Sequence, residues 1–169
     1  METCIVEGNI SVKAVLLGKK RKVHKILVDA KKKDKDTAFI LHKAKEAQVD
    51  ITYMKREEID ALATGKTHGG IIAYCGQRKY QNLEELVNKK QVFLALVEGV
   101  EDPFNFGYVL RTLYAAGCDG VLVPLRNWTT AADVVTRASA GASEYINIII
   151  ADDMEDTLTY LHQKDIMLL

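Results

Sequence analysis

The stretches VFLALV at residues 92–97 and DPFNFGYVLR at residues 102–111 decide the fold of this chain. The first stretch is short and continuously apolar, which predicts a buried strand, and the second leaves that strand through a polar loop and opens a helix. Open parallel sheets bind ligands outside the carboxyl ends of their strands, and helix N-termini offer free N–H groups to anions. Asn105 and Arg111 are therefore the first candidates for a functional site.

The sequence after residue 91 alternates between apolar strand-like runs and helical patterns. The predicted strands are 92–98, 120–124 and 146–151, the predicted helices are 106–116, 131–138 and 155–163, and residues 166–169 read as a further half-strand. Regular alternation of this kind predicts right-handed βαβ crossovers and a parallel sheet. Because the chain stops inside an apolar half-strand, we expect it to be an incomplete product.

The sequence before residue 77 predicts a second, smaller α/β unit. Its predicted helices are 11–17, closed by Gly18, then 34–49 and 56–63, and its predicted strands are 23–29, 51–54 and 70–75. The polar, aperiodic residues 77–82 form the predicted linker, and 83–89 a short helix leading into the second unit. The fold class is therefore α/β with two domains, residues 1–82 and residues 83–169, the second being the first part of a parallel-sheet domain.

The two halves carry opposite charge although the whole chain is neutral. Residues 1–90 hold 19 Lys and Arg against 12 Asp and Glu, a net +7, and residues 91–169 hold 4 against 11, a net −7. The first half is thus the candidate for binding a polyanion. The basic residues gather after the first helix, where the candidates are Lys19, Lys20, Arg21 and Lys22. The alternative is a merely solubilising surface.

Composition sets the broad class of the protein. With 48% hydrophobic and 27% charged residues, the chain is a globular protein rather than a disordered one. Its three cysteines lack the spacing of a zinc site or a disulfide framework, and its four histidines show no metal-ligand spacing. No basic and apolar leader and no run of 18 apolar residues is present, so we expect a cytoplasmic protein without bound metal and without membrane contact.

Each candidate residue also has a purely structural interpretation. Asn105 fits the N-cap of a helix that Pro103 approaches, and Arg111 fits a side chain that snorkels past apolar neighbours. Gly65, Lys66 and Thr67 suggest a phosphate-binding loop, but the motif needs a glycine where the chain has Asp60, and a following helix instead of a strand. Trp128 lies in a loop on the same sheet edge as Asn105 and either lines the site or packs.

The combination of these residues is more specific than any one of them. Asp102-Pro103, Asn105, Gly107 and Arg111, followed by Ser139-Ala140-Gly141-Ala142 before a strand, resembles the first motif region of the SpoU branch of the SPOUT RNA methyltransferases. The matching spacings extend without gaps over about 40 residues. Residues 64–70 resemble the glycine-containing turn of the ribosomal-protein-like domain that holds RNA in many SpoU enzymes.

The resemblance implies an enzyme that moves a methyl group from S-adenosylmethionine to a ribose 2′-hydroxyl of ribosomal or transfer RNA. The matching positions imply catalytic roles for Arg111, which orients that hydroxyl, and for Asn105, which fixes the geometry beside it. Lys66 and His68, in the glycine turn, join the basic residues as candidate substrate-binding residues. The resemblance further implies a homodimer.

The chain also departs from the family pattern. A Gly-x-Glu-x-Gly loop and a Ser-Leu-Asn stretch, which hold the methyl donor in the family, do not occur, so we expect the cofactor-binding residues to lie beyond Leu169 and this chain alone to be inactive. The main alternative is a non-catalytic RNA-binding module. A nucleotide-binding oxidoreductase is disfavoured because no Gly-x-Gly-x-x-Gly motif follows strand 92–98.

Overall fold

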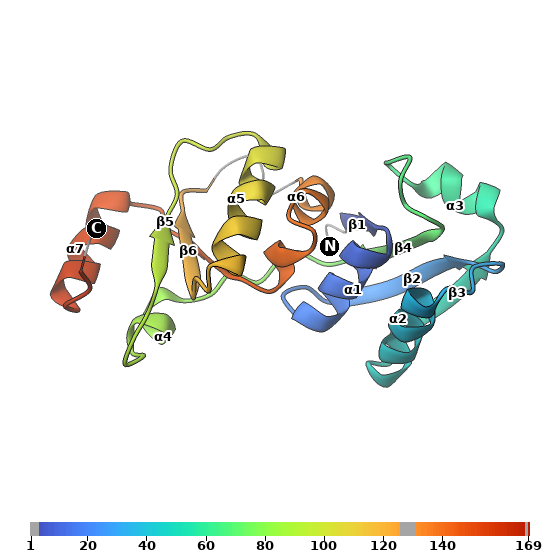
Figure 1. Ribbon diagram of the computed structural model, residues 1–169, viewed down its shortest axis with the longest axis horizontal. Coiled ribbons are helices and arrows are strands. Elements are labelled where there is room, and N and C mark those ends of the chain that lie inside the picture. Colours follow the sequence, from blue (N-terminus) through green and yellow to red (C-terminus); the bar gives the residue numbers. More distant parts are fainter. Residues whose placement is uncertain (1–3, 126–130, 168) are drawn as a thin grey trace.

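Two α/β units, each built on its own sheet, lie side by side along the long axis of the molecule (Figure 1). The computed structural model describes residues 4–125, 131–167 and 169. The loop with Trp128, predicted to line a site or to pack, lies outside the described residues.

The first unit is a four-stranded mixed sheet between two helical layers. Its elements are β1 (Cys4–Glu7), α1 (Asn9–Gly18), β2 (Val23–Asp29), α2 (Lys35–Glu46), β3 (Asp50–Met54), α3 (Arg56–Leu62) and β4 (Ile71–Cys75). The strand order is β1-β4-β2-β3; β4 is antiparallel to both neighbours, and β2 and β3 are parallel. Val12, Val15 and Ile40 bring α1 and α2 onto one face of the sheet, and Ile59 brings α3 onto the other.

The second unit alternates strands and helices. Its elements are α4 (Leu83–Val87), β5 (Leu94–Leu96), α5 (Pro103–Ala115), β6 (Gly120–Val123), α6 (Ala132–Ala138), the short 3₁₀ helix η2 (Ala142–Glu144), β7 (Asn147–Ile150) and α7 (Met154–Gln163). The three strands pair in the order β5-β6-β7, and both pairs are parallel. The predicted α/β class and the parallel sheet are confirmed.

Helices cover both faces of β6 and β7, whereas the edge strand β5 is only partly buried, with Leu96 39% exposed, so the expectation of a buried strand at residues 92–97 is wrong. Phe106 and Leu110 of α5, with Val135 of α6, cover one face, and Leu86 of α4 with Leu161 of α7 cover the other. Neighbouring residues of a strand point to opposite faces, so a strand buried on both sides reads as a continuous apolar run. This explains why β6 and β7 were recognisable in the sequence.

Several elements differ from those predicted: helix α2 ends at Glu46 instead of residue 49, strand β5 is shorter than residues 92–98, and helix α5 begins at Pro103 instead of residue 106. Strand β1 was not predicted. Helix α1 extends through Gly18, and the left-handed residue that ends it is Lys19 at φ 56°. Ile166, Met167 and Leu169 are not in a strand, because no ladder joins them to β5 or to another described strand; Leu168 lies outside the described residues.

The two units meet where α1 and β1 of the first pack on α6 and η2 of the second. Glycines make this contact possible. A Cβ on Gly18 would lie 1.9 Å from the carbonyl oxygen of Glu144, and a Cβ on Gly141 would lie 2.6 Å from the Ala14 Cβ. Within the stretch Ser139–Ala142, Gly141 is the residue that makes this close approach to α1.

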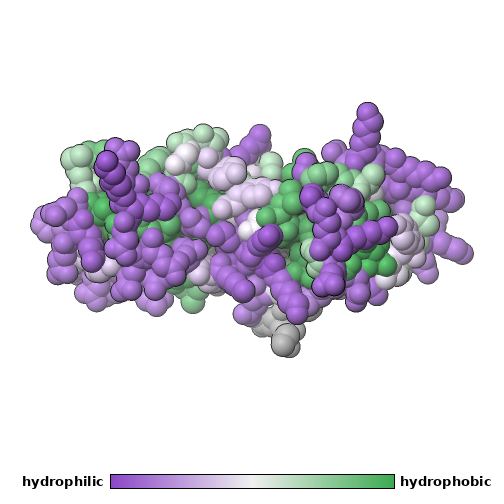
Figure 2. Space-filling view, turned by 90° about the horizontal axis from the view of Figure 1, so that it is seen from below, coloured by the Kyte–Doolittle hydropathy of each residue, from purple (hydrophilic) through white to green (hydrophobic). Residues whose placement is uncertain are grey.

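The surface is largely hydrophilic on the face seen from below, with an apolar area on each half (Figure 2). Scattered apolar side chains of this kind are normal on a folded domain. No helix among the described residues combines the length and the apolar character needed to cross a bilayer.

Candidate functional site

Helix α5 positions the two predicted catalytic residues. Asp102 is its N-cap and accepts a hydrogen bond from the Asn105 N–H at 2.9 Å, and Pro103 occupies the first helical position. These are favoured residues at those positions. Asn105 is therefore not the N-cap, and its exposed side chain is left free for another role.

Gly107 sets how closely α5 approaches α6. A Cβ at this position would lie 2.6 Å from the Ala138 Cβ and 3.0 Å from the Val135 carbonyl oxygen. The neighbouring Phe106 is 1% exposed and anchors the helix in the core. The Asn-x-Gly spacing thus places the exposed amide of Asn105 two residues before Gly107, which the packing of α5 on α6 requires.

Asn105 and Arg111 are both exposed on α5. Six residues of α-helix place them about 9 Å apart along the axis and about 120° apart around it. Arg111 shares its face with Phe104 and Tyr108, which lie seven and three residues earlier and are 50% and 55% exposed. The two candidates therefore occupy neighbouring rather than opposite surfaces of one helix.

The Arg111 guanidinium forms no ion pair or hydrogen bond with any residue that the structure describes. A free guanidinium presents a planar set of donors that matches a phosphate or carboxylate. A guanidinium has donors and no acceptor, so it orients a ligand and stabilises negative charge rather than removing a proton. Arg111 is chemically suited to hold an anion beside α5.

The predicted basic residues divide into a free set and an engaged set. Lys19, Lys22 and Lys66 are exposed. Lys20 donates from Nζ to Asn147 Oδ1 at 2.6 Å, and Arg21 donates from Nε to Glu144 Oε1 at 3.2 Å. The structure therefore leaves the first set available to a polyanion and uses the second to join the two units.

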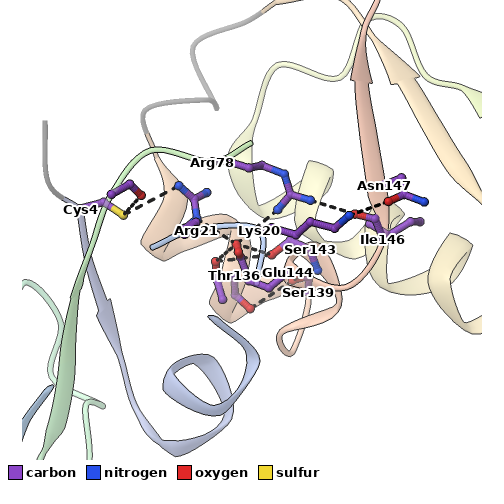
Figure 3. A network of polar contacts seen from close by, with 11 residues as sticks. Cys4, Lys20, Arg21, Arg78, Thr136, Ser139, Ser143, Glu144, Ile146 and Asn147 are labelled. Carbon is purple, nitrogen blue, oxygen red and sulfur yellow. Dashed lines mark hydrogen bonds and ion pairs between the residues drawn. The ribbon is translucent and has the colours of Figure 1, made fainter. Parts of the chain in front are cut away.

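Glu144 is the centre of a buried polar cluster between the units (Figure 3). Its side chain is 0% exposed, and Arg21 and Arg78 approach its Oε1 atom at 3.2 Å and 3.5 Å. Thr136 Oγ1 donates to the same oxygen at 3.2 Å, and Arg78 Nη2 donates to the Ile146 carbonyl at 2.8 Å. Both arginines come from the first unit or the connecting segment, and the carboxylate comes from the second.

Burial lowers the pKa of two cations in this cluster. Desolvation lowers the pKa of Arg78 to about 10, although the nearby Glu144 carboxylate opposes the shift. Desolvation also lowers the pKa of Lys20, and repulsion from Arg78 adds to the effect. Arg78 Nε and Glu144 Oε2 have no hydrogen-bond partner among the described residues. A carboxylate held by two cations, with one oxygen unpaired, holds the units together and leaves some polar groups unsatisfied.

His68 is a structural residue here. It is 4% exposed, its Nδ1 accepts a hydrogen bond from the Gly70 N–H at 3.2 Å, and its Nε2 lies 3.0 Å from Asp60 Oδ1. These contacts fix the glycine turn before β4, and they leave the imidazole no open edge for a substrate. The turn itself reaches a cavity through Thr67 and Gly69.

Sequence reasoning missed the residues that join the units. Arg78 lies in the segment interpreted as a linker, and Glu144 follows the Ser139–Ala142 stretch at a position that was given no role. The one available signal was the position of Glu144, an isolated carboxylate between Ala142 and the apolar strand that follows. Its two arginine partners are more than 60 residues away, so their pairing was not visible in local pattern.

Comparisons with known proteins agree with this architecture. Residues 5–81 match the family of RNA 2′-O ribose methyltransferase substrate-binding domains, and residues 91–169 match the SpoU rRNA Methylase family. A TrmH-family tRNA/rRNA methyltransferase of Staphylococcus aureus strain COL is 28% identical over 167 residues, which is 95% of this chain and 66% of that protein. The YacO protein of Bacillus subtilis strain 168, of the same family, is 27% identical over 86% of this chain and 60% of its own length.

Solved structures share the fold. A crystal structure described as an RNA 2′-O ribose methyltransferase superimposes with a TM-score of 0.72 at 21% identity, over 96% of this chain and 60% of that chain. The SpoU methyltransferase AviRb of Streptomyces viridochromogenes, solved in complex with AdoMet, gives a TM-score of 0.74 at 14% identity over the same shares. The chain thus spans about two thirds of the curated relatives and three fifths of these structures.

The parallel sheet and the superposition on these structures define the class as an α/β protein of the SPOUT methyltransferase fold. The substrate-binding match at residues 5–81 comes before the methylase match at residues 91–169. The chain belongs to the SpoU family of RNA methyltransferases.

Proposed function

We propose that this chain is the RNA-binding domain and the first part of the catalytic domain of an enzyme that methylates a ribose 2′-hydroxyl of ribosomal or transfer RNA. The observation that carries the proposal is the free, exposed Arg111 guanidinium on α5, with Asn105 on the same helix. A ribose hydroxyl is a weak nucleophile until its proton passes to a base such as solvent water and the negative charge that develops on its oxygen is stabilised. An arginine anchored on a helix that is itself packed in the core can supply that stabilisation.

RNA is the proposed partner, and the first unit is its proposed binding surface. Lys19, Lys22 and Lys66 are free to contact phosphates, and such contacts bring affinity but little sequence information. The second unit carries net −7 and does not attract a polyanion by overall charge. We further propose that the whole enzyme is a cytoplasmic homodimer, as the resemblance implies.

S-adenosylmethionine is the proposed methyl donor of the whole enzyme, in line with the AdoMet complexes of AviRb and of an rRNA methyltransferase from Sinorhizobium meliloti. The residues described here do not fit it. A cavity of about 1020 Å³ runs along β5 and is large enough, but its lining is apolar apart from three lysines and Asp165. A sulfonium cation is repelled by such a set, so we assign no donor-binding residue to this chain.

Calorimetric titration tests the cofactor assignment. We expect this chain to show no heat of binding for S-adenosylmethionine at concentrations up to the millimolar range, because the described residues form no suitable pocket. Binding in the micromolar range would contradict that expectation and would place a donor site within residues 1–169.

Methyl transfer is tested with the product of the whole gene. That protein is incubated with tritiated S-adenosylmethionine and with ribosomal or transfer RNA, and the RNA is then hydrolysed with alkali. A 2′-O-methylated nucleotide lacks the hydroxyl that attacks the adjoining phosphate, so tritium in alkali-stable dinucleotides supports the proposal. Tritium only in mononucleotides would mean base methylation and would contradict it.

The second candidate is an RNA-binding module without catalysis. The ion pairs of Glu144 with Arg21 and Arg78 favour this candidate, because they join the two units into one surface for RNA. This candidate predicts that the whole protein transfers no methyl group, so Arg111→Ala has no transfer rate to lower. Loss of methyl transfer in that variant, with RNA affinity retained, decides for the enzyme.

A further inference from the structure

A cavity of about 360 Å³ lies where the two units meet. The first unit contributes the start of α1, with Gly8, Asn9 and Ser11, and also Lys32 and Thr67. The second unit contributes Arg137, at the end of α6. Because both units line it, the cavity has this shape only in the docked arrangement.

The start of α1 presents unpaired donors to this cavity. Gly8, the N-cap at φ 84°, has no side chain to cap the helix, and no acidic residue stands in the first turn. The Gly8 N–H is already bonded to the Ile71 carbonyl, and the first helical bond runs from Val12 to Gly8. The intervening N–H groups of residues 9–11 have no backbone acceptor among the described residues. Such groups, with the helix dipole behind them, favour an anion.

Ser11 points independently to a ligand. It is 4% exposed, it lines the cavity, and its hydroxyl has no hydrogen-bond partner within the described part of the chain. Side chains of a helix tilt toward its N-terminus, so the hydroxyl of this third helical residue is directed to the end that opens on the cavity. This hydroxyl can donate a hydrogen bond to an oxygen of a ligand bound in the cavity.

Two cations complete the lining. Arg137 Nη2 lies 3.3 Å from Asp133, and Lys32 Nζ lies 2.7 Å from Asp34, and neither of these carboxylates lines the cavity. The carboxylate that does line it belongs to Glu7.

The Glu7 carboxylate is turned toward the glycine loop. Its oxygens accept hydrogen bonds from the Thr64 N–H and hydroxyl and from the Gly65 N–H, at 3.0 Å for Gly65 to Oε2. Its lone pairs are therefore largely taken up by this loop. The Glu7 oxygens are thus engaged with the glycine loop, while Lys32 and Arg137 line the cavity beside the first turn of α1.

We propose that this cavity binds a phosphate group of an RNA nucleotide, held by the first-turn N–H groups of α1, the Ser11 hydroxyl and the Arg137 guanidinium. The inference rests on the proposed RNA-binding function and specifies one contact of it. The volume is that of a small-ligand pocket and accommodates a mononucleotide rather than a phosphate alone. An RNA strand seated there bridges the two units.

The cavity is tested first with small probes, by two-dimensional ¹H–¹⁵N NMR of this chain. Uridine 5′-monophosphate and inorganic phosphate should each shift the backbone amides of residues 9–11, and uridine, which has no phosphate, should not. Arg137→Gln should weaken binding of the monophosphate at least about tenfold, since a charge-assisted hydrogen bond is lost. Lys45→Gln, which removes an exposed cation on α2 outside the cavity, is the matched control and should leave binding unchanged.

A second variant, Gly65→Ala, keeps the charge of Arg137 but changes the position of its guanidinium. A Cβ on Gly65 would lie 2.5 Å from Arg137 Nη1, so Gly65→Ala should displace the guanidinium and weaken monophosphate binding as well. Dispersed NMR spectra show that each variant is folded. Absence of amide shifts at residues 9–11 with both phosphate probes, or equal binding by wild type and Arg137→Gln, would overturn the proposal.

The RNA assignment is tested with a single-stranded RNA by fluorescence anisotropy over a salt series. Arg137→Gln should lower the affinity and reduce the salt dependence by about one phosphate contact. If the monophosphate binds in the cavity but RNA affinity and salt slope are unchanged in the variant, the ligand is a free nucleotide and the RNA assignment is overturned. If wild type binds no RNA while the amides still respond to the monophosphate, the proposed RNA-binding function fails and the cavity remains an anion site.

Discussion

At the scale of single residues, Arg111 and Arg21 show how environment separates two arginines of the same sequence. Arg111 is exposed and unpaired among the described residues, whereas the side chain of Arg21 is 8% exposed and held by Glu144. The first is available to a ligand, and the second is part of the architecture. Net charge alone does not distinguish them.

Arg111→Ala should leave stability unchanged and remove methyl transfer. The side chain makes no contact whose loss destabilises the fold, so the free energy of unfolding of this chain should change by less than about 0.5 kcal/mol in urea titration. In the whole enzyme, loss of transition-state stabilisation should lower the rate of methyl transfer about 100-fold or more. Arg56→Ala, at an exposed site on α3, is the control and should keep full activity; equal rates in both variants would remove Arg111 from the site.

Glu144→Ala should destabilise the chain by about 3–5 kcal/mol, because it leaves the buried Arg21 and Arg78 cations without a counter-charge. Urea titration at pH 7 measures the loss. Glu46→Ala, which removes an exposed carboxylate on α2, should cost far less. A loss below about 1 kcal/mol at Glu144 would mean that the cluster contributes little to stability.

At the scale of elements, the sequence predicted most strands and helices of both units because each apolar run is buried on a defined face. It missed β1, whose four residues Cys4–Glu7 are too few for a pattern and become a strand through pairing with β4, far away in the chain. It placed the start of α5 three residues late, because Asp102 and not Asn105 caps that helix. Local propensity does not report such pairings.

The candidate site was predictable in its exposed part and not in its buried part. The spacing of Asn105 and Arg111 on one helix follows from the sequence, and both side chains are exposed. The engagement of Lys20 and Arg21 does not, because their partners Asn147 and Glu144 lie more than 120 residues away. Tertiary contacts decided which basic residues remain free.

Asp119 joins the loop after α4 to the start of β6, and its contribution to stability should depend on pH. Hydrogen bonds from Lys89 Nζ at 2.7 Å and from the Phe93 N–H at 2.9 Å lower the pKa of this carboxyl below its usual value. A depressed carboxyl pKa stabilises the folded state above the unfolded-state pKa of about 4, and the effect is lost as pH falls through the folded-state value.

Asp119→Asn should therefore cost stability at pH 7, by less than about 1 kcal/mol because the pair is partly exposed and screened by solvent. The difference between variant and wild type should shrink toward pH 2, as measured by thermal unfolding at several pH values. A difference that stays constant from pH 7 to pH 2 would show that the charge of Asp119 has no part in it.

At the scale of the whole molecule, the junction between the units depends on the absence of a side chain at Gly18. A Cβ there would lie 1.9 Å from the Glu144 carbonyl oxygen, a distance that backbone atoms do not tolerate. Gly18→Ala should push the units apart while each keeps its own core. Small-angle X-ray scattering should show a larger radius of gyration, and Lys19→Ala, one residue along and exposed, should leave the radius unchanged. An unchanged radius in Gly18→Ala would contradict this account of the junction.

The buried cluster around Glu144 also determines how the protein responds to being cut. Severing the backbone between residues 82 and 83 would give one fragment whose Arg21 and Arg78 regain water and another whose Glu144 does the same, and neither loses an apolar core by the cleavage. Both fragments should stay dissolved and recombine through complementary charge, in a complex that rising ionic strength weakens. The same contacts that unite the halves thus make the protein suited to reconstitution from two separately produced pieces.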